Sequence, residues 1–137
     1  MYNKVSGEII KELREICGDV NVSTEATDLQ NYSHDEVPEI GKLPEVVVKP
    51  ASAQEISKIL KLANKNLIPV TPRGGGTGLS GGAVPVNGGI LLSLERMNKI
   101  IEVDQNNLMV VVEPGVVVSA LKNEVQKTGL LYPVDPA

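Results

Sequence analysis

The chain has 137 residues, enough for a single domain with a core of ordinary size. Its net charge is −4, from 13 basic and 17 acidic residues, and no more than two basic residues are adjacent, which argues against nucleic acid as the main partner. The N-terminus lacks the apolar stretch of a signal peptide, no apolar run approaches the roughly 18–20 residues of a membrane span, and the single Cys17 cannot form an internal disulfide, so we expect a cytoplasmic protein.

Residues 1–43 are predicted to form one helix followed by a loop. Val5, Ile9 and Leu13 recur at helical spacing, and Gly18 stands where a glycine would end the helix. Cys17 continues the apolar face, so we interpret it as a small buried residue and not as a reactive thiol. Residues 23–42 show no sustained periodicity, which predicts an irregular connection.

Residues 44–94 are predicted to contain a βαβ unit and a further strand. Residues 44–50 form an apolar stretch between prolines, typical of a short buried strand. Ser52 and Glu55 have the spacing of a capping box that opens a helix, and 67–71 is the next strand. The core face expected for that helix consists of Ile56, Ile59, Leu60 and Ala63. Strand, helix and strand in this order predict that the two strands are parallel.

Residues 99–129 are predicted to form a hairpin and a helix, after another apolar strand at 89–94. The segments 100–104 and 108–113 flank a polar turn, as in a β-hairpin. The helix that follows has an apolar face and ends at a glycine, after which 130–132 returns toward the sheet. Its predicted face is Val117, Leu121 and Val125. With no closing element after this, we expect a single truncated domain of the α+β class.

A glycine-rich loop leaves the second predicted strand. Six of the nine residues at positions 74–82 are glycines. Glycine allows positive φ and a close approach of the backbone to a ligand, so such a loop can aim several main-chain N–H groups at one anion. Arg73 adds a cation, and Thr77 and Ser80 add hydroxyl donors. The loop therefore predicts a phosphate or pyrophosphate site.

Two common phosphate motifs do not fit this loop. Gly76-x-Gly78-x-x-Gly81 matches the spacing of a Rossmann loop, and Glu95 lies where a ribose-binding carboxylate would be sought. A Rossmann loop must open into a helix, however, and here Pro85 and further glycines follow. The chain's one Gly-Lys pair is followed by leucine, which excludes a P-loop. The alternative that the glycines only make tight turns explains their number poorly.

His34 is the only histidine, and its neighbour Asp35 suggests an acid–base or metal role. A lone imidazole without a second histidine or a cysteine ligand is weak evidence for a metal. We interpret His34 as a surface residue, and predict no metal ligand and no catalytic residue.

Residues 72–82 closely resemble the FAD pyrophosphate loop of the vanillyl-alcohol oxidase / p-cresol methylhydroxylase superfamily, most like its glycolate oxidase and D-lactate dehydrogenase branch. Residues 44–50 with Ser52 and Glu55 resemble the opening strand and helix of that family, and 113–136 resembles the stretch before its next flavin contacts. The resemblance implies a PCMH-type FAD-binding fold. It would comprise a first sub-domain with a small βαβ-containing sheet flanked by helices, and part of a second sheet region.

The resemblance also implies which residues contact the cofactor. Carried over, the FAD contacts are Arg73, Gly74, Gly75, Gly76, Thr77, Gly78, Ser80, Gly81, Gly82, Pro133 and Asp135. Relatives that attach FAD covalently through this loop carry a histidine at the position of Thr77, so non-covalent FAD is implied here.

The activity implied by the resemblance is that of a flavin-dependent 2-hydroxy-acid dehydrogenase or oxidase of the glycolate or D-lactate type. This chain would be its FAD-binding portion, without the substrate part, and the whole enzyme would act with a redox partner in the cytoplasm or at the membrane surface. The alternative is a non-catalytic nucleotide-binding module, or a fragment that holds no FAD alone. In either case exposed sheet edges predict self-association.

Overall fold

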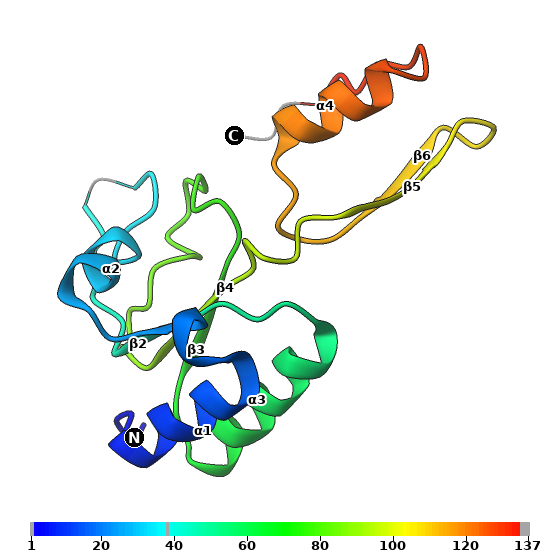
Figure 1. The fold of residues 1–137 in the computed structure, drawn as a ribbon. Coiled ribbons are helices and arrows are strands. Elements are labelled where there is room, and N and C mark those ends of the chain that lie inside the picture. Colours follow the sequence, from blue (N-terminus) through cyan, green and yellow to red (C-terminus); the bar gives the residue numbers. More distant parts are fainter. Residues whose placement is uncertain (1, 38, 135–137) are drawn as a thin grey trace.

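The computed structural model describes residues 2–37 and 39–134, which form helices, two sheets and connecting loops (Figure 1). The elements in chain order are α1 (Gly7–Cys17), a 3₁₀ turn (Asp19–Asn21), β1 (Val22–Ser23), α2 (Ala26–Asn31), β2 (Val46–Val48), α3 (Ala53–Lys65), β3 (Val70–Arg73), β4 (Ile90–Ser93), β5 (Ile100–Asp104), β6 (Met109–Val112) and α4 (Val118–Gln126). The α+β class predicted from the sequence is confirmed.

The larger sheet has the strand order β1-β2-β4-β3. β2 and β3 each pair with β4 in parallel, and β1 pairs with β2 antiparallel. β2 and β3 are therefore parallel as predicted, but the later strand β4 lies between them. All four residues of β4 are buried, which suits the centre of a sheet. β3 carries Pro72, which lacks a backbone N–H and belongs on an edge.

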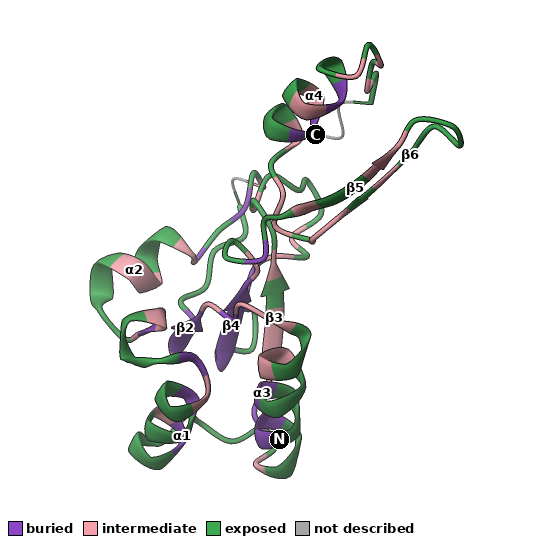
Figure 2. Cartoon of the chain, turned by 45° about the vertical axis from the view of Figure 1, so that its right-hand side comes forward, coloured by how far each residue is buried: buried purple, intermediate pink, exposed green. Residues whose placement is uncertain are grey.

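Helices α1 and α3 lie side by side on one face of this sheet (Figures 1 and 2). The buried core that they share with the strands consists of Ile9, Leu13, Cys17, Val22, Val46, Val48, Ile59, Leu62, Ala63, Ile68, Ile90 and Leu92. Figure 2 shows β2 and β4 as buried throughout, whereas the hairpin and α4 consist mainly of exposed and intermediate residues. The buried core of the chain thus lies in the βαβ unit with α1.

Two predicted helix limits, the end of α1 at Gly18 and the start of α3 at Ser52, are confirmed by their caps, whereas α4 ends at Gln126 and not at the predicted Gly129. The Ser6 hydroxyl accepts from the N–H of Ile9, and Gly18 ends α1 with a φ of 85°. The Ser52 hydroxyl accepts from the N–H of Glu55 at 3.2 Å, and the Glu55 carboxylate accepts from the N–H of Ala51 at 2.8 Å. The start of α3 is therefore fixed by side chains that satisfy otherwise unpaired backbone donors.

One predicted core residue of α3 is wrong. Leu60 is 46% exposed, whereas Leu62 is buried. Ile56, Ile59 and Ala63 face the core as predicted, and a helix of 3.6 residues per turn brings position 62 onto their side. Leu60 falls about 100° from Ile59 around the helix axis and so reaches solvent.

The prediction of an irregular connection over residues 23–42 is wrong in its first half. The short helix α2 lies there, preceded by the two-residue strand β1. No side chain caps the N-terminus of α2, and six residues are too few to show a periodic apolar face. The helical structure of α2 therefore depends on its place in the fold, because the local sequence does not predict it.

The hairpin β5–β6 forms as predicted and makes a separate two-stranded sheet. Together with α4 it projects from the body of the chain (Figure 1). Leu121 and Val125 are the buried residues of α4, as predicted, but Val117 precedes the helix and is 65% exposed. Residues 130–132 form no strand. Leu130 and its neighbours instead line an apolar hollow of about 540 Å³ against the hairpin.

Cys17 is buried at the end of α1, as its place in the apolar pattern predicts. Burial, followed by the nearby Glu55 carboxylate, raises the pKa of the Cys17 thiol to about 12. The thiol therefore remains protonated near neutral pH, which agrees with a packing role. Among the described residues, no helix has both the length and the apolar character needed to cross a membrane.

Candidate functional site

The candidate site lies where three parallel strands end. Parallel strands bring their carboxyl ends to one edge of a sheet, where ligands bind in open α/β sheets. Lys49 follows β2, Arg73 ends β3, and Glu95 comes two residues after β4. The glycine-rich loop begins directly after Arg73. The topology therefore places the loop beside charged side chains from both other parallel strands.

The main-chain N–H groups of the loop have no partners within the described part of the chain. No N–H of residues 74–82 donates a hydrogen bond there. The contact from the neighbouring segment uses a loop carbonyl instead, since Gly78 accepts from the N–H of Glu36 at 3.3 Å. Gly76 and Gly81 have φ values of 74° and 71°, a conformation that favours glycine. The loop thus presents unpaired backbone donors, as an anion site requires.

Arg73 is built into the base of this loop. Its Nη1 donates to the carbonyl oxygen of His34 at 2.5 Å. A Cβ added at Gly76 would collide with the Arg73 guanidinium, so the backbone of Gly76 passes directly over that group. The cation therefore lies against the loop backbone and contributes positive potential at the loop.

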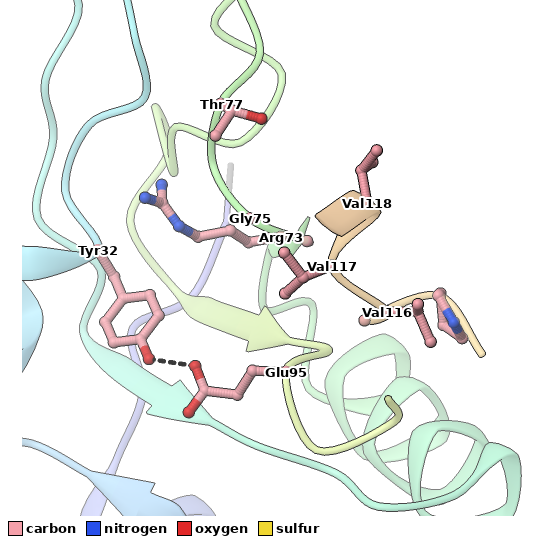
Figure 3. Close-up of a pocket in the computed structure, with 11 residues that line it drawn as sticks. Tyr32, Arg73, Gly75, Thr77, Glu95, Val116, Val117 and Val118 are labelled. Carbon is pink, nitrogen blue, oxygen red and sulfur yellow. Dashed lines mark hydrogen bonds between the residues drawn. The ribbon is translucent and has the colours of Figure 1, made fainter. Parts of the chain in front are cut away.

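A cavity of about 600 Å³ opens beside the loop (Figure 3). Its lining comprises Tyr32, Arg73, Gly74, Gly75, Thr77, Glu95, Pro114, Gly115, Val116, Val117 and Val118. One wall is the glycine loop, and the opposite wall is the apolar segment that leads into α4. The cavity thus combines backbone donors, a charged end and an apolar surface, a combination typical of cofactor pockets.

Gly115 fixes the distance between those two walls. Its N–H donates to the carbonyl oxygen of Met97 at 2.8 Å. A Cβ at this position would collide with the carbonyl oxygen of Leu94, which belongs to the backbone and cannot move aside. The segment before α4 is therefore held against the residues that follow β4.

Tyr32, Lys49 and Glu95 form a hydrogen-bonded cluster at the charged end of the cavity. The Tyr32 hydroxyl donates to Glu95 Oε2 at 2.6 Å (Figure 3), and Lys49 Nζ lies 2.7 Å from Glu95 Oε1. Burial alone would raise the pKa of Glu95, but hydrogen bonds from Lys49, Tyr32 and Ser93 outweigh it and lower that pKa. Burial and the bond to Glu95 raise the pKa of Tyr32. Both side chains therefore keep their ordinary charge states near neutral pH.

Only some of the residues predicted for the site line this cavity. Those that line it are Arg73, Gly74, Gly75 and Thr77, and those of the same loop that do not are Gly76, Gly78, Ser80, Gly81 and Gly82. Pro133 is exposed and lies outside the lining, and Asp135 is outside the described residues. Contact of all these residues with a cofactor stays a prediction. His34 is exposed, and no group of three or more potential metal ligands occurs among the described residues.

Two polar lining residues are not predicted from the sequence. Tyr32 follows a short helix that the sequence does not signal. From the sequence, Glu95 is a candidate only for the ribose-binding carboxylate of a Rossmann site. That site is excluded because no helix follows the glycine loop. The position of Glu95 just after an apolar strand parallel to the loop-bearing strand is the signal that could identify it, because both then meet at the same sheet edge.

Residues 44–137 match the family described as the FAD binding domain. The chain belongs to this family. The match covers the βαβ unit, the glycine loop, the hairpin and α4, and so includes every lining residue except Tyr32.

Named relatives of this FAD-binding chain include hydroxy-acid enzymes. A D-lactate dehydrogenase of Anaerostipes hadrus is 44% identical over 98% of the chain and 28% of its own length. Glycolate oxidase subunit GlcD of Bacillus subtilis (strain 168) is 35% identical over 97% of the chain and 28% of its own length. A structure of p-cresol methylhydroxylase with substrate bound is 28% identical with a TM-score of 0.82, over 93% of this chain and 26% of that one. The predicted family resemblance and PCMH-type fold are confirmed, and the chain spans about a quarter of these proteins.

The cluster around Glu95 predicts a pH-dependent contribution to stability. The pKa of Glu95 is lowered from 4.5 on folding, so its contribution is present above that pH and is lost as the pH falls through the lower folded value. The pKa of Lys49 is raised above 10.5, because its bonds to Glu95 and Tyr32 outweigh burial, so its contribution is lost only as the pH rises beyond that value.

We expect Glu95→Gln to lower the free energy of unfolding by about 0.5–1 kcal/mol near pH 7, since the Glu95 side chain is 45% exposed. The difference from the wild type should shrink as the pH falls to about 4 and below. Denaturant unfolding across this pH range measures it. Glu102→Gln, at an exposed glutamate of the hairpin, is the matched control, and identical profiles for the two variants would contradict a role of the cluster.

Proposed function

We propose that the glycine loop of this chain binds the diphosphate of FAD through its main-chain N–H groups. The observation that carries the proposal is that no N–H of residues 74–82 has a partner among the described residues, although the loop lines a cavity. Unpaired donors that converge on a site favour a multiply charged anion. The family of the chain supplies the identity of that anion.

The rest of the cavity suits a dinucleotide cofactor. The apolar wall of Val116, Val117 and Val118 can contact a flat ring system, and the Arg73 guanidinium supports the negative charge of the diphosphate. Thr77 stands at the cavity with a hydroxyl and no nucleophilic nitrogen, and His34 is not among the lining residues. We therefore propose that the cofactor is held non-covalently.

We propose that the full-length polypeptide oxidises a 2-hydroxy acid of the glycolate or D-lactate type. FAD held by residues 74–82 would supply the two-electron chemistry that converts the hydroxy acid to its 2-keto acid, and a redox partner would take the electrons. The support is the identity with D-lactate dehydrogenase and glycolate oxidase relatives. The role of this chain is to bind and orient the cofactor. A cytoplasmic location is proposed as well, and cell fractionation would test it.

The activity proposal predicts that glycolate or D-lactate bleaches the flavin absorbance of the full-length protein under anaerobic conditions. A hydroxy acid that reduces the flavin must lose its α-hydrogen, so the corresponding 2-keto acid should appear in equal amount. Lactate of the opposite configuration serves as control. Retention of full absorbance with both acids would contradict the proposed substrate class.

The site proposal predicts that Gly75→Val abolishes flavin retention. A Cβ at Gly75 meets only Thr77 at 3.8 Å, an ordinary contact, and Gly75 has no positive φ, so the fold should tolerate valine. The valine side chain would stand among the open N–H groups and block the anion. Val86→Ala, which shortens an exposed side chain beyond the loop, is the control.

Flavin absorbance after gel filtration and the unfolding temperature are measured for both variants in the full-length polypeptide. Acid precipitation of the wild type should release its flavin into solution, as non-covalent binding requires. Full flavin retention by Gly75→Val at wild-type stability would contradict the diphosphate site.

The alternative function is a nucleotide-binding module without catalysis, or a fragment that holds no FAD alone. The apolar residues Ile101, Leu108, Met109 and Leu131 are all more than half exposed, which agrees with an incomplete surface around the hairpin and α4. We therefore expect the isolated 137 residues to bind FAD weakly or not at all and to self-associate. Gel filtration with added FAD measures both, and a monomer that retains one FAD would contradict both expectations.

A further inference from the structure

Tyr32 occupies a fixed position between the glycine loop and the charged cluster. It caps the C-terminus of α2, and its side chain extends across the carboxyl edge of the sheet to Glu95 (Figure 3). The hydroxyl donates to Glu95 at 2.6 Å, and the same carboxylate binds Lys49 at 2.7 Å and the Ser93 hydroxyl at 3.0 Å. Residues that follow two buried parallel strands therefore hold the outer end of the Tyr32 ring.

The ring of Tyr32 contacts the cation at the base of the loop. The Arg73 Cζ atom lies 5.6 Å from the ring centroid, within the range of a cation–π interaction. The same guanidinium donates to the carbonyl oxygen of His34, two residues further along the chain. One short segment thus holds Arg73 by two contacts. A third contact joins this segment to the loop itself, where the N–H of Glu36 donates to Gly78.

The guanidinium in turn shapes the loop. It fills the space that a side chain at Gly76 would need, and Gly76 turns over it with a φ of 74°. A displacement of Arg73 would therefore leave this turn without support on its inner side. The contacts run without a break from Glu95 through Tyr32 and Arg73 to the loop backbone.

We propose that Tyr32 is a positioning residue that holds the diphosphate-binding loop in its open arrangement by fixing Arg73 beneath Gly76. The inference rests on the proposed function, because it assigns a role in the same FAD site. Tyr32 acts through Arg73 and the loop, and takes no part in the chemistry. Preorganised donors bind an anion more tightly because less loop entropy is lost on binding.

The test is the affinity of the full-length apoprotein for FAD in a double-mutant cycle. Tyr32→Leu removes the ring and should raise the Kd for FAD by about three- to tenfold, the size of a partly desolvated cation–π contact. Tyr32→Phe keeps the ring and should stay within about twofold of the wild type. In an Arg73→Met background, Tyr32→Leu should add no further loss, because the group that it holds is already gone.

Each outcome supports the inference or overturns it. Tyr32→Leu with wild-type affinity, or an equal loss in the Arg73→Met background, would overturn it while FAD binding stands. A wild-type apoprotein that takes up no FAD would overturn the proposed function and this inference together.

The unfolding temperature of every variant shows whether it folds, and Tyr32→Met replaces the leucine variant if that one does not. A loss shared equally by Tyr32→Phe would place the effect in the hydroxyl bond to Glu95 and would overturn the role of the ring.

Discussion

The main-chain N–H groups of the glycine loop are the constraint on which the architecture depends. Backbone donors left unpaired in a protein interior are costly, so this loop must face solvent or a ligand. Its N–H groups can remain unpaired only where a well-packed part of the fold supports the loop. The support is β4 with β2 and β3 on either side, packed against α1 and α3. Ile90 and Leu91 are fully buried, and with them the strand that anchors the site is among the least accessible parts of the chain.

The two walls of the cavity differ in how firmly they are built. The loop follows a strand of the buried sheet, whereas the opposite wall belongs to a segment that carries the exposed hairpin and α4 (Figure 1). A two-stranded sheet on its own is marginally stable. Close packing of Gly115 against the carbonyl oxygen of Leu94 joins the second wall to the end of β4. The width of the cavity therefore depends on Gly115, just as the shape of the loop depends on its own glycines.

Much of this could be predicted from the sequence, because the features concerned are local. The caps at Ser6 and Ser52, the buried strands and the glycine loop are each encoded within a few neighbouring residues. The position of β4 between β2 and β3, and the contacts of Tyr32 with Glu95 and Arg73, join residues far apart in the chain. No local pattern specifies such pairs. The error at Leu60 is of another kind, since a neighbouring leucine at position 62 competed for the same helix face and the geometry of α3 decided between them.

The charges around the cavity show how a chain of net charge −4 can hold an anion. Lys49 is neutralised by Glu95, and Arg73 is the cation that lies against the loop. Neither the net charge nor a cluster of cations therefore attracts the ligand. The backbone N–H dipoles of the loop must supply most of the stabilisation, and they act only at short range. Because N–H groups do not titrate, the strength of such a site depends on loop geometry and not on pH. The contact that fixes Arg73 beneath the loop, from the ring of Tyr32, then matters more than the number of charges.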